Sequence, residues 1–130
     1  NLYFYAWEGR LIAQLTDFTF GRVWEVSAGS RVSVAASFTS TSDVPIEAVR
    51  VAIVLVDYFD EIIADYKVSL MGLVEPGETI PLKQDVPLLA RRTPLMGFIW
   101  IDAVRLSDGR LIQVRREDVE RMMAEHHYGR

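Results

Sequence analysis

The sequence predicts a mainly β domain, an antiparallel sandwich of about seven strands followed by a short C-terminal α-helix. Three observations predict this fold class. Short apolar segments alternate with turn residues along most of the chain, the segment Val49–Tyr58 is apolar on both faces, and the hydrophobic period changes from two to a helical one near the C-terminus. We therefore divide the chain into residues 1–4, a sandwich over residues 5–115, and a helix with a tail over residues 116–130.

Composition limits the classes of function. The chain has 130 residues, of which 50% are hydrophobic and 25% are charged, as is typical of one globular domain. The net charge of −4 disfavours a nucleic-acid surface, which needs clustered Lys and Arg. The absence of cysteine excludes disulfides, cysteine nucleophiles and thiolate metal sites. The longest apolar run, Val51–Val56, is too short for membrane insertion of this segment.

The first residues have two interpretations. Asn1–Phe4 resembles the remnant of an engineered cleavage tag, but that pattern continues with Gln and Tyr5 follows here. The alternative is a native aromatic segment. We favour the tag and leave residues 1–4 out of the predicted fold, which leaves open a signal or anchor in the natural protein.

The first half of the chain predicts strands in a simple order. Leu11–Phe20 supplies the first strand, with Trp24 in the core beside it. Arg31–Thr39 alternates apolar and polar residues, as a strand with one wet face does. Ser40–Pro45 predicts a loop, because hydroxyl side chains, Asp and Pro favour local bonds to the backbone.

The segment Val49–Tyr58 predicts a central strand that is covered on both sides. A sandwich covers only one face of each sheet, so a helix, a loop or another chain must cover the second face. Asp60 and Glu61 then form a turn, and Ile62–Leu70 returns as the next strand.

Turn residues divide the second half. Glu75–Glu78 contains Pro and Gly and predicts a tight turn. Thr79–Leu89 contains two prolines and predicts an irregular edge strand, followed by a loop over Arg91–Pro94. Met96–Leu106 and Arg110–Val114 predict a hairpin. The expected core includes Val34, Phe38, Val51, Ile53, Leu55 and Trp100.

The C-terminus predicts a helix of about three turns, which is marginal alone in water and must dock on a surface. One helical face carries Val119, Met122, Met123 and His126. The second apolar face of Val49–Val56 is one docking site for it. The alternative is a homodimer, or another protein contact, through that face or through the Thr79–Leu89 edge.

Three groups of side chains have both a functional and a structural interpretation. The first is an acidic group in one hairpin, and we favour a polar turn over a calcium site or an acid–base pair for it; its members are Asp57, Asp60, Glu61 and Asp65. His126 and His127 are adjacent, so they point apart on a helix and form a poor metal pair; a frayed helix end is favoured. Aromatic side chains in strands usually lie in the core, so we favour core positions over an exposed ligand-binding platform for six aromatics: Trp7, Trp24, Tyr58, Phe59, Tyr66 and Trp100.

The stretch from Val32 to Leu89 resembles bacterial immunoglobulin-like sandwich modules of the FxLYD type. The resemblance lies in the alternating strand Val32–Phe38, the loop Ser40–Ile46, the segment Val54–Asp57 and the turn Glu75–Glu78. Asp60-Glu61 replaces a glycine that is usual there, and the loop lacks a common Asn. The resemblance implies an immunoglobulin-like fold without catalytic residues, in an exported or envelope-anchored protein.

No catalytic triad, phosphate loop or ligand set is recognisable, so we expect no catalytic, cofactor-binding or metal-binding residues. The expected function is a non-catalytic structural or protein-interaction module of a bacterial, envelope-associated protein, located in the periplasm or cell envelope. Its expected partner is another protein or a second copy. A small-ligand or carbohydrate-binding module is the alternative, and it requires aromatic side chains exposed together on one face.

Overall fold

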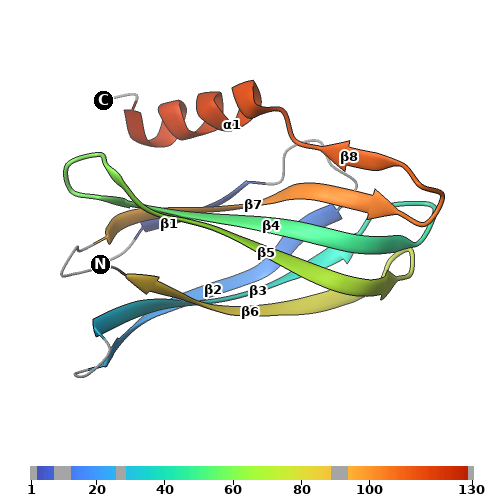
Figure 1. Ribbon diagram of the computed structural model, residues 1–130, viewed down its shortest axis with the longest axis horizontal. Coiled ribbons are helices and arrows are strands. Elements are labelled where there is room, and N and C mark those ends of the chain that lie inside the picture. Colours follow the sequence, from blue (N-terminus) through green and yellow to red (C-terminus); the bar gives the residue numbers. More distant parts are fainter. Residues whose placement is uncertain (1–2, 8–12, 26–28, 89–93, 129–130) are drawn as a thin grey trace.

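The computed structural model describes residues 3–7, 13–25, 29–88 and 94–128, which form two β-sheets and a C-terminal helix. The larger sheet has the order β1-β7-β4-β5 with β8 also on β7, and the smaller has the order β2-β3-β6. The sheets form two layers, and α1 lies on the outside of the larger one (Figure 1). The elements are β1 Tyr3–Trp7, β2 Ala13–Glu25, β3 Gly29–Ser40, β4 Ile46–Asp57, β5 Ile62–Val74, β6 Thr79–Leu88, β7 Pro94–Leu106, β8 Leu111–Gln113, α1 Arg116–Met123 and the π-helical turn η1 Ala124–Tyr128.

The core between the sheets follows the period of two that the sequence predicts. In β3 the even-numbered residues from Val32 to Phe38 are buried, while their odd-numbered neighbours are partly exposed. These side chains meet one face of β4, which carries Val49, Val51, Ile53 and Leu55. All six core residues named from the sequence are buried: Val34, Phe38, Val51, Ile53, Leu55 and Trp100.

The second apolar face of β4 is covered from within the chain. Ala52, Val54 and Val56 join a second cluster on the outside of the larger sheet, which we call the outer cluster. Its other members come from β7 and from the C-terminal helix: Met96, Phe98, Trp100, Met122 and Met123. Val119 packs against the cluster, so three of the four residues predicted to share a helical face lie on it. The helix therefore covers the second apolar face of β4, and this face is not open for the homodimer contact that the sequence offered as the alternative.

The strand β1 corrects the sequence-based description of the N-terminus. It begins at Tyr3, so residues 3 and 4, which we left outside the fold, pair with β7, and Leu11–Phe20 does not lie in the first strand. This pairing is parallel, unlike every other pairing among the described strands. On the same edge of β7, β8 pairs with residues 103–105 and β1 pairs with residues 96–100, so the two short strands share that edge.

The structure also corrects the predictions for β6 and for Pro94. The strand β6 is not irregular: it pairs with β3 over ten residues without a shift of register. Pro94 belongs to β7 rather than to a loop. Residues 89–93, which hold the rest of that predicted loop, and the side chain of Trp24 are outside the described part.

The predicted turns are present and have the expected local chemistry. The hydroxyl of Ser42 accepts a hydrogen bond of 3.0 Å from the Val44 N–H, as the loop composition predicts. Gly77 and Gly109 have φ angles of 81° and 96° in the turns before β6 and β8, where an L side chain would be strained. These turns bring the strands into the order described above.

Candidate functional site

The tip of the β4–β5 hairpin is built around a buried carboxylate. Asp57 is only 5% exposed, and its Oδ1 accepts hydrogen bonds from the backbone N–H groups of Phe59 (2.9 Å) and Glu61 (3.0 Å). The Asp57 N–H donates to the Glu61 carbonyl at 2.9 Å, and Asp60 has a φ of 63°. A non-glycine residue in this left-handed region is uncommon, and Asp tolerates it better than most residues do. The tip therefore has one defined backbone shape.

This shape leaves three large hydrophobic side chains in water. Tyr58 is 56% exposed, Phe59 81% and Ile62 50%. They lie next to one another in the sequence around the turn, at the end of the sandwich opposite β8 (Figure 1). We call these three residues the hydrophobic tip. Sequence reasoning placed Tyr58 in a strand and favoured a core role for both aromatics; the structure places Tyr58 in the turn and exposes both.

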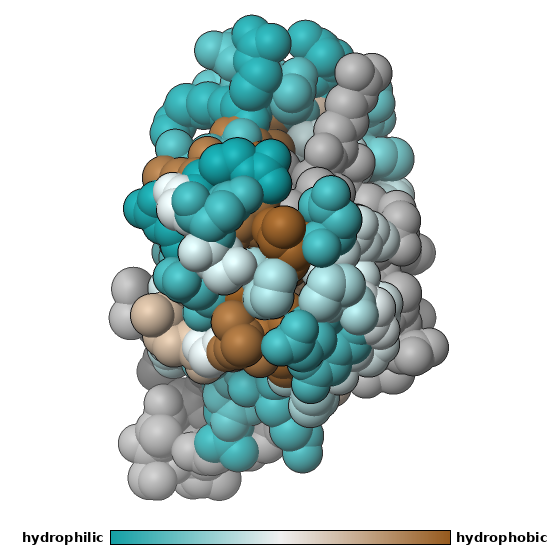
Figure 2. Space-filling view, turned by 90° about the vertical axis from the view of Figure 1, so that its right-hand side faces the viewer, coloured by the Kyte–Doolittle hydropathy of each residue, from teal (hydrophilic) through white to brown (hydrophobic). Residues whose placement is uncertain are grey.

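A second group of exposed hydrophobic residues lies at the other end. Met71 and Leu73 of β5 and Leu111 of β8 are 79%, 58% and 48% exposed. Met71, Ala48, Arg105 and Leu111 are successive cross-strand partners, so Met71 and Leu111 face the same side of the larger sheet. Figure 2 shows brown side chains surrounded by teal on this end of the molecule.

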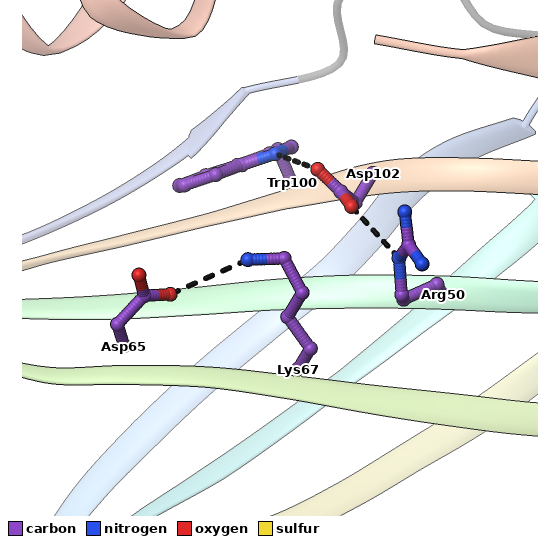
Figure 3. A network of polar contacts seen from close by, with 5 residues as sticks. All are labelled: Arg50, Asp65, Lys67, Trp100 and Asp102. Atoms are coloured by element: carbon purple, nitrogen blue, oxygen red, sulfur yellow. Dashed lines mark hydrogen bonds and ion pairs between the residues drawn. The ribbon is translucent and has the colours of Figure 1, made fainter. Parts of the chain in front are cut away.

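The four acidic residues of the hairpin have separate roles. Asp57 holds the turn, Asp60 and Glu61 are exposed at it, and Asp65 makes a loose ion pair of 3.5 Å with Lys67 on the outer face of β5 (Figure 3). Among the residues that the structure describes, no three His, Asp or Glu side chains are grouped to hold a metal ion. The arrangement is that of a polar turn.

A polar network borders the outer cluster. Asp102 accepts hydrogen bonds from the Arg50 Nε at 2.8 Å and from the Trp100 indole Nε1 at 3.2 Å (Figure 3). Trp100 and Asp102 come from β7 and Arg50 from β4. By strand alternation, Arg50 and Asp102 share the outer face of the sheet with Ala52 and Trp100. The Asp102 side chain is 13% exposed and that of Arg50 is 39% exposed. The network thus satisfies the indole N–H of a buried tryptophan at the margin of the cluster.

We expect Asp102→Ala to lower the free energy of unfolding by about 1–3 kcal/mol, because it leaves the Trp100 N–H without an acceptor in a mostly buried site. Asp102→Asn keeps one acceptor oxygen and is expected to lose less. Urea melts followed by tryptophan fluorescence measure both. Asp43→Ala is the control, since that aspartate is exposed in the loop between β3 and β4; an equal loss in the control would contradict the role given to Asp102.

The β7–β8 turn holds a carboxyl group with a lowered pKa, that of Asp108. The backbone N–H of Arg110 donates to Asp108 Oδ1 at 3.1 Å and lowers the Asp108 pKa, with a further contribution from the Arg110 guanidinium at 2.9 Å. Stability from a lowered carboxyl pKa is present above the unfolded-state pKa and is lost as the pH falls through the folded-state pKa. Because Asp108 is fully exposed, this is a local property of the turn.

Among the described side chains, the aromatics do not gather into a ligand platform, which was the alternative to core positions. Trp100 is buried in the outer cluster, and Tyr5 and Trp7 pack against that cluster. Tyr66 packs against the core between the sheets, and its hydroxyl lies 3.3 Å from the Gln84 side-chain nitrogen that donates to it. Of the six aromatics named from the sequence, Tyr58 and Phe59 are the exposed ones in the described part.

The histidine region also differs from the expected frayed end. The turn η1 continues the helix to Tyr128, and the His126 ring stacks on Tyr5 with centroids 4.3 Å apart. Tyr5 in turn stacks on Phe98 at 5.8 Å. His126 thus ties the end of the helix to β1; the side chain of His127 is outside the described residues.

Comparisons with protein-family models, curated proteins and solved structures find no match for this chain. None of the helices in the described residues is long and apolar enough to cross a membrane.

Proposed function

We propose that this chain is an immunoglobulin-like, non-catalytic protein-interaction domain of a bacterial, envelope-associated protein, and that it binds a protein partner through the hydrophobic tip. The envelope location and the immunoglobulin-like class come from the sequence resemblance over Val32 to Leu89. The strand order supports the class, since β2, β3 and β6 lie in one sheet and β4, β7 and β8 in the other, as in such sandwiches.

The observation that carries the proposal is the exposure of Tyr58, Phe59 and Ile62 on a hairpin whose backbone is held in place. Burying one such side chain gains about 1.5–3 kcal/mol, so water is an unfavourable environment for all three. Aromatic anchors at a protruding position are typical of binding hot spots. A turn that already has its bound shape loses little conformational entropy on binding.

A protein partner fits the tip better than a small ligand does. Small molecules bind in concave sites that surround most of their surface, whereas the tip is a convex loop. A convex hydrophobic tip requires the partner to supply the cavity. We therefore expect a partner with an apolar groove or pocket.

Site-specific photo-cross-linking in the cells that make the protein tests the proposal. A photoreactive phenylalanine analogue at position 59 is expected to yield a discrete cross-linked protein. The same analogue at Lys83, which is exposed on β6 of the other sheet, is the matched control and is expected to yield none.

A triple variant, Tyr58→Ser, Phe59→Ser and Ile62→Thr, is expected to lose the partner while its urea midpoint stays near the wild-type value, because all three side chains are exposed. Equal adducts from positions 59 and 83, or unchanged partner binding by the triple variant, would contradict the proposal.

A further inference from the structure

The strand β5 is the open edge of the larger sheet. It pairs with β4 on one side, and no other described strand pairs with its far side (Figure 1). Register shifts occur near both ends of β5, but Ala64–Met71 pairs with β4 without interruption. This edge contains no proline. Over Ala64–Met71 it presents an uninterrupted row of backbone donors and acceptors of the kind that accepts another strand.

The β6 edge of the smaller sheet differs from β5, although it also carries a Lys and an Asp two residues apart, Lys83 and Asp85. The strand β6 carries Pro81 and Pro87, which have no N–H to donate to an added strand. Its Asp85 already accepts a hydrogen bond of 2.8 Å from Ser33 and lies 3.4 Å from Arg31. The sequence predicted that the Thr79–Leu89 edge could accept another strand, but β5 is better suited to this than β6 is.

The charges on β5 complement those of a second copy of the same strand. Asp65 and Lys67 flank Tyr66 and point to the outer face, where their side chains are 59% and 45% exposed. In an antiparallel pair of β5 strands with Tyr66 opposite Tyr66, each Asp65 lies opposite a Lys67. Opposite charges in directly facing positions stabilise such a pair, and like charges destabilise it.

We propose that the chain forms a homodimer through β5, with the two larger sheets joined into one across a two-fold axis at Tyr66. This interface is isologous, because the same strand is used by both copies. The antiparallel arrangement also places the Ile62 end of one strand beside the partner end that carries Met71 and Leu73. Ile62 and Met71 are 50% and 79% exposed in the single chain and lie on the outer face of the larger sheet. With Tyr66 opposite Tyr66, Ile62 faces Leu70 of the second copy and lies beside its Met71, so Ile62 and Met71 gain apolar neighbours. The inference rests on the proposed protein-interaction role and extends it from the hydrophobic tip to a second surface, the β5 edge, where the partner is a second copy of the chain.

Sedimentation equilibrium at tens of micromolar tests the dimer. The wild-type chain is expected to be dimeric, and Lys67→Asp or Asp65→Lys, which place like charges opposite each other, to weaken the dimer about tenfold or more. The double variant Asp65→Lys with Lys67→Asp exchanges the two charges and is expected to restore the wild-type dissociation constant. Urea melts check that each variant folds, as these exposed positions predict.

Lys83→Asp is the matched control, since it reverses the same charge on the β6 edge beside Asp85. It is expected to leave the dimer unchanged. The chain has no cysteine, so a single introduced cysteine reports the register. Facing residues lie about 4.5–5.5 Å apart, within disulfide reach, so Tyr66→Cys is expected to form a linked dimer on oxidation and Gln84→Cys is not.

Three results would overturn the dimer: a wild-type monomer at these concentrations, an unaffected dimer in Lys67→Asp, or equal disruption by Lys83→Asp. The proposed function fails separately. A monomer that still cross-links to another protein from position 59 keeps the function and removes the dimer. A β5 dimer without cross-links from position 59 keeps the dimer and removes the role of the tip.

Discussion

Replacing Phe38 by alanine is expected to lower the free energy of unfolding by about 3–5 kcal/mol. Phe38 is 0% exposed and lies on β3 at the centre of the smaller sheet, facing the core between the sheets. The substitution removes the aromatic ring and leaves a cavity that neighbours on both sheets cannot fill, since their strands are held by hydrogen bonds. Urea denaturation followed by circular dichroism measures the loss.

Phe59→Ala is the matched control for this prediction. It removes the same side chain from a position that is 81% exposed, and it is expected to change the free energy of unfolding by less than about 0.5 kcal/mol. A loss below roughly 1 kcal/mol for Phe38→Ala would show that this ring does not contribute to the core.

Removing the two buried methionines of the helix is expected to have the second large effect. Met122 and Met123 are 5% and 7% exposed, and they cover Ala52, Val54 and the aromatic side chains of β7. A buried Met→Ala substitution costs about 2–5 kcal/mol, and the double variant removes most of the apolar contact that docks the short helix. Since a helix of this length is marginal alone, we expect residues 116–128 to lose helical structure as well.

Hydrogen exchange measures this second effect directly. In the double variant, the amides of α1 are expected to exchange rapidly, and a dye that binds exposed hydrophobic surface is expected to bind the larger sheet. Glu120→Ala is the control, because Glu120 is exposed on the same helix. A double variant with wild-type protection in α1 would show that the helix is held by other contacts.

Much of the local structure was predictable because its causes are local. The alternation in Val32–Phe38 predicts one buried face whatever the neighbouring strands are. The turn at Glu75–Glu78 and the hairpin after Leu106 follow from proline and glycine geometry. The two apolar faces of β4 predict two coverings, although they do not say what the second covering is.

The candidate site was less predictable. Strand aromatics usually lie in the core, and this expectation holds for Trp100 but not for Tyr58 and Phe59. The difference comes from Asp57, which accepts hydrogen bonds from two backbone N–H groups and is the last residue of β4, so Tyr58 lies outside the strand that was predicted over Val49–Tyr58. The sequence signal that sets Tyr58 and Phe59 apart from Trp100 is their position beside a turn, which does not necessarily bury its aromatic side chains.

The sequence by itself determined the strands from β2 onward, the turns between them and the amphipathic helix, because these depend on the period of the side chains and on the φ angles of a few residues. Only the tertiary structure decided that β1 runs parallel to β7, that α1 covers β4 and β7, and that β5 is an open edge. These features depend on contacts between segments far apart in the chain. Several partners satisfy an apolar face or a strand edge equally well, so the choice rests on which of them the folded chain brings within reach.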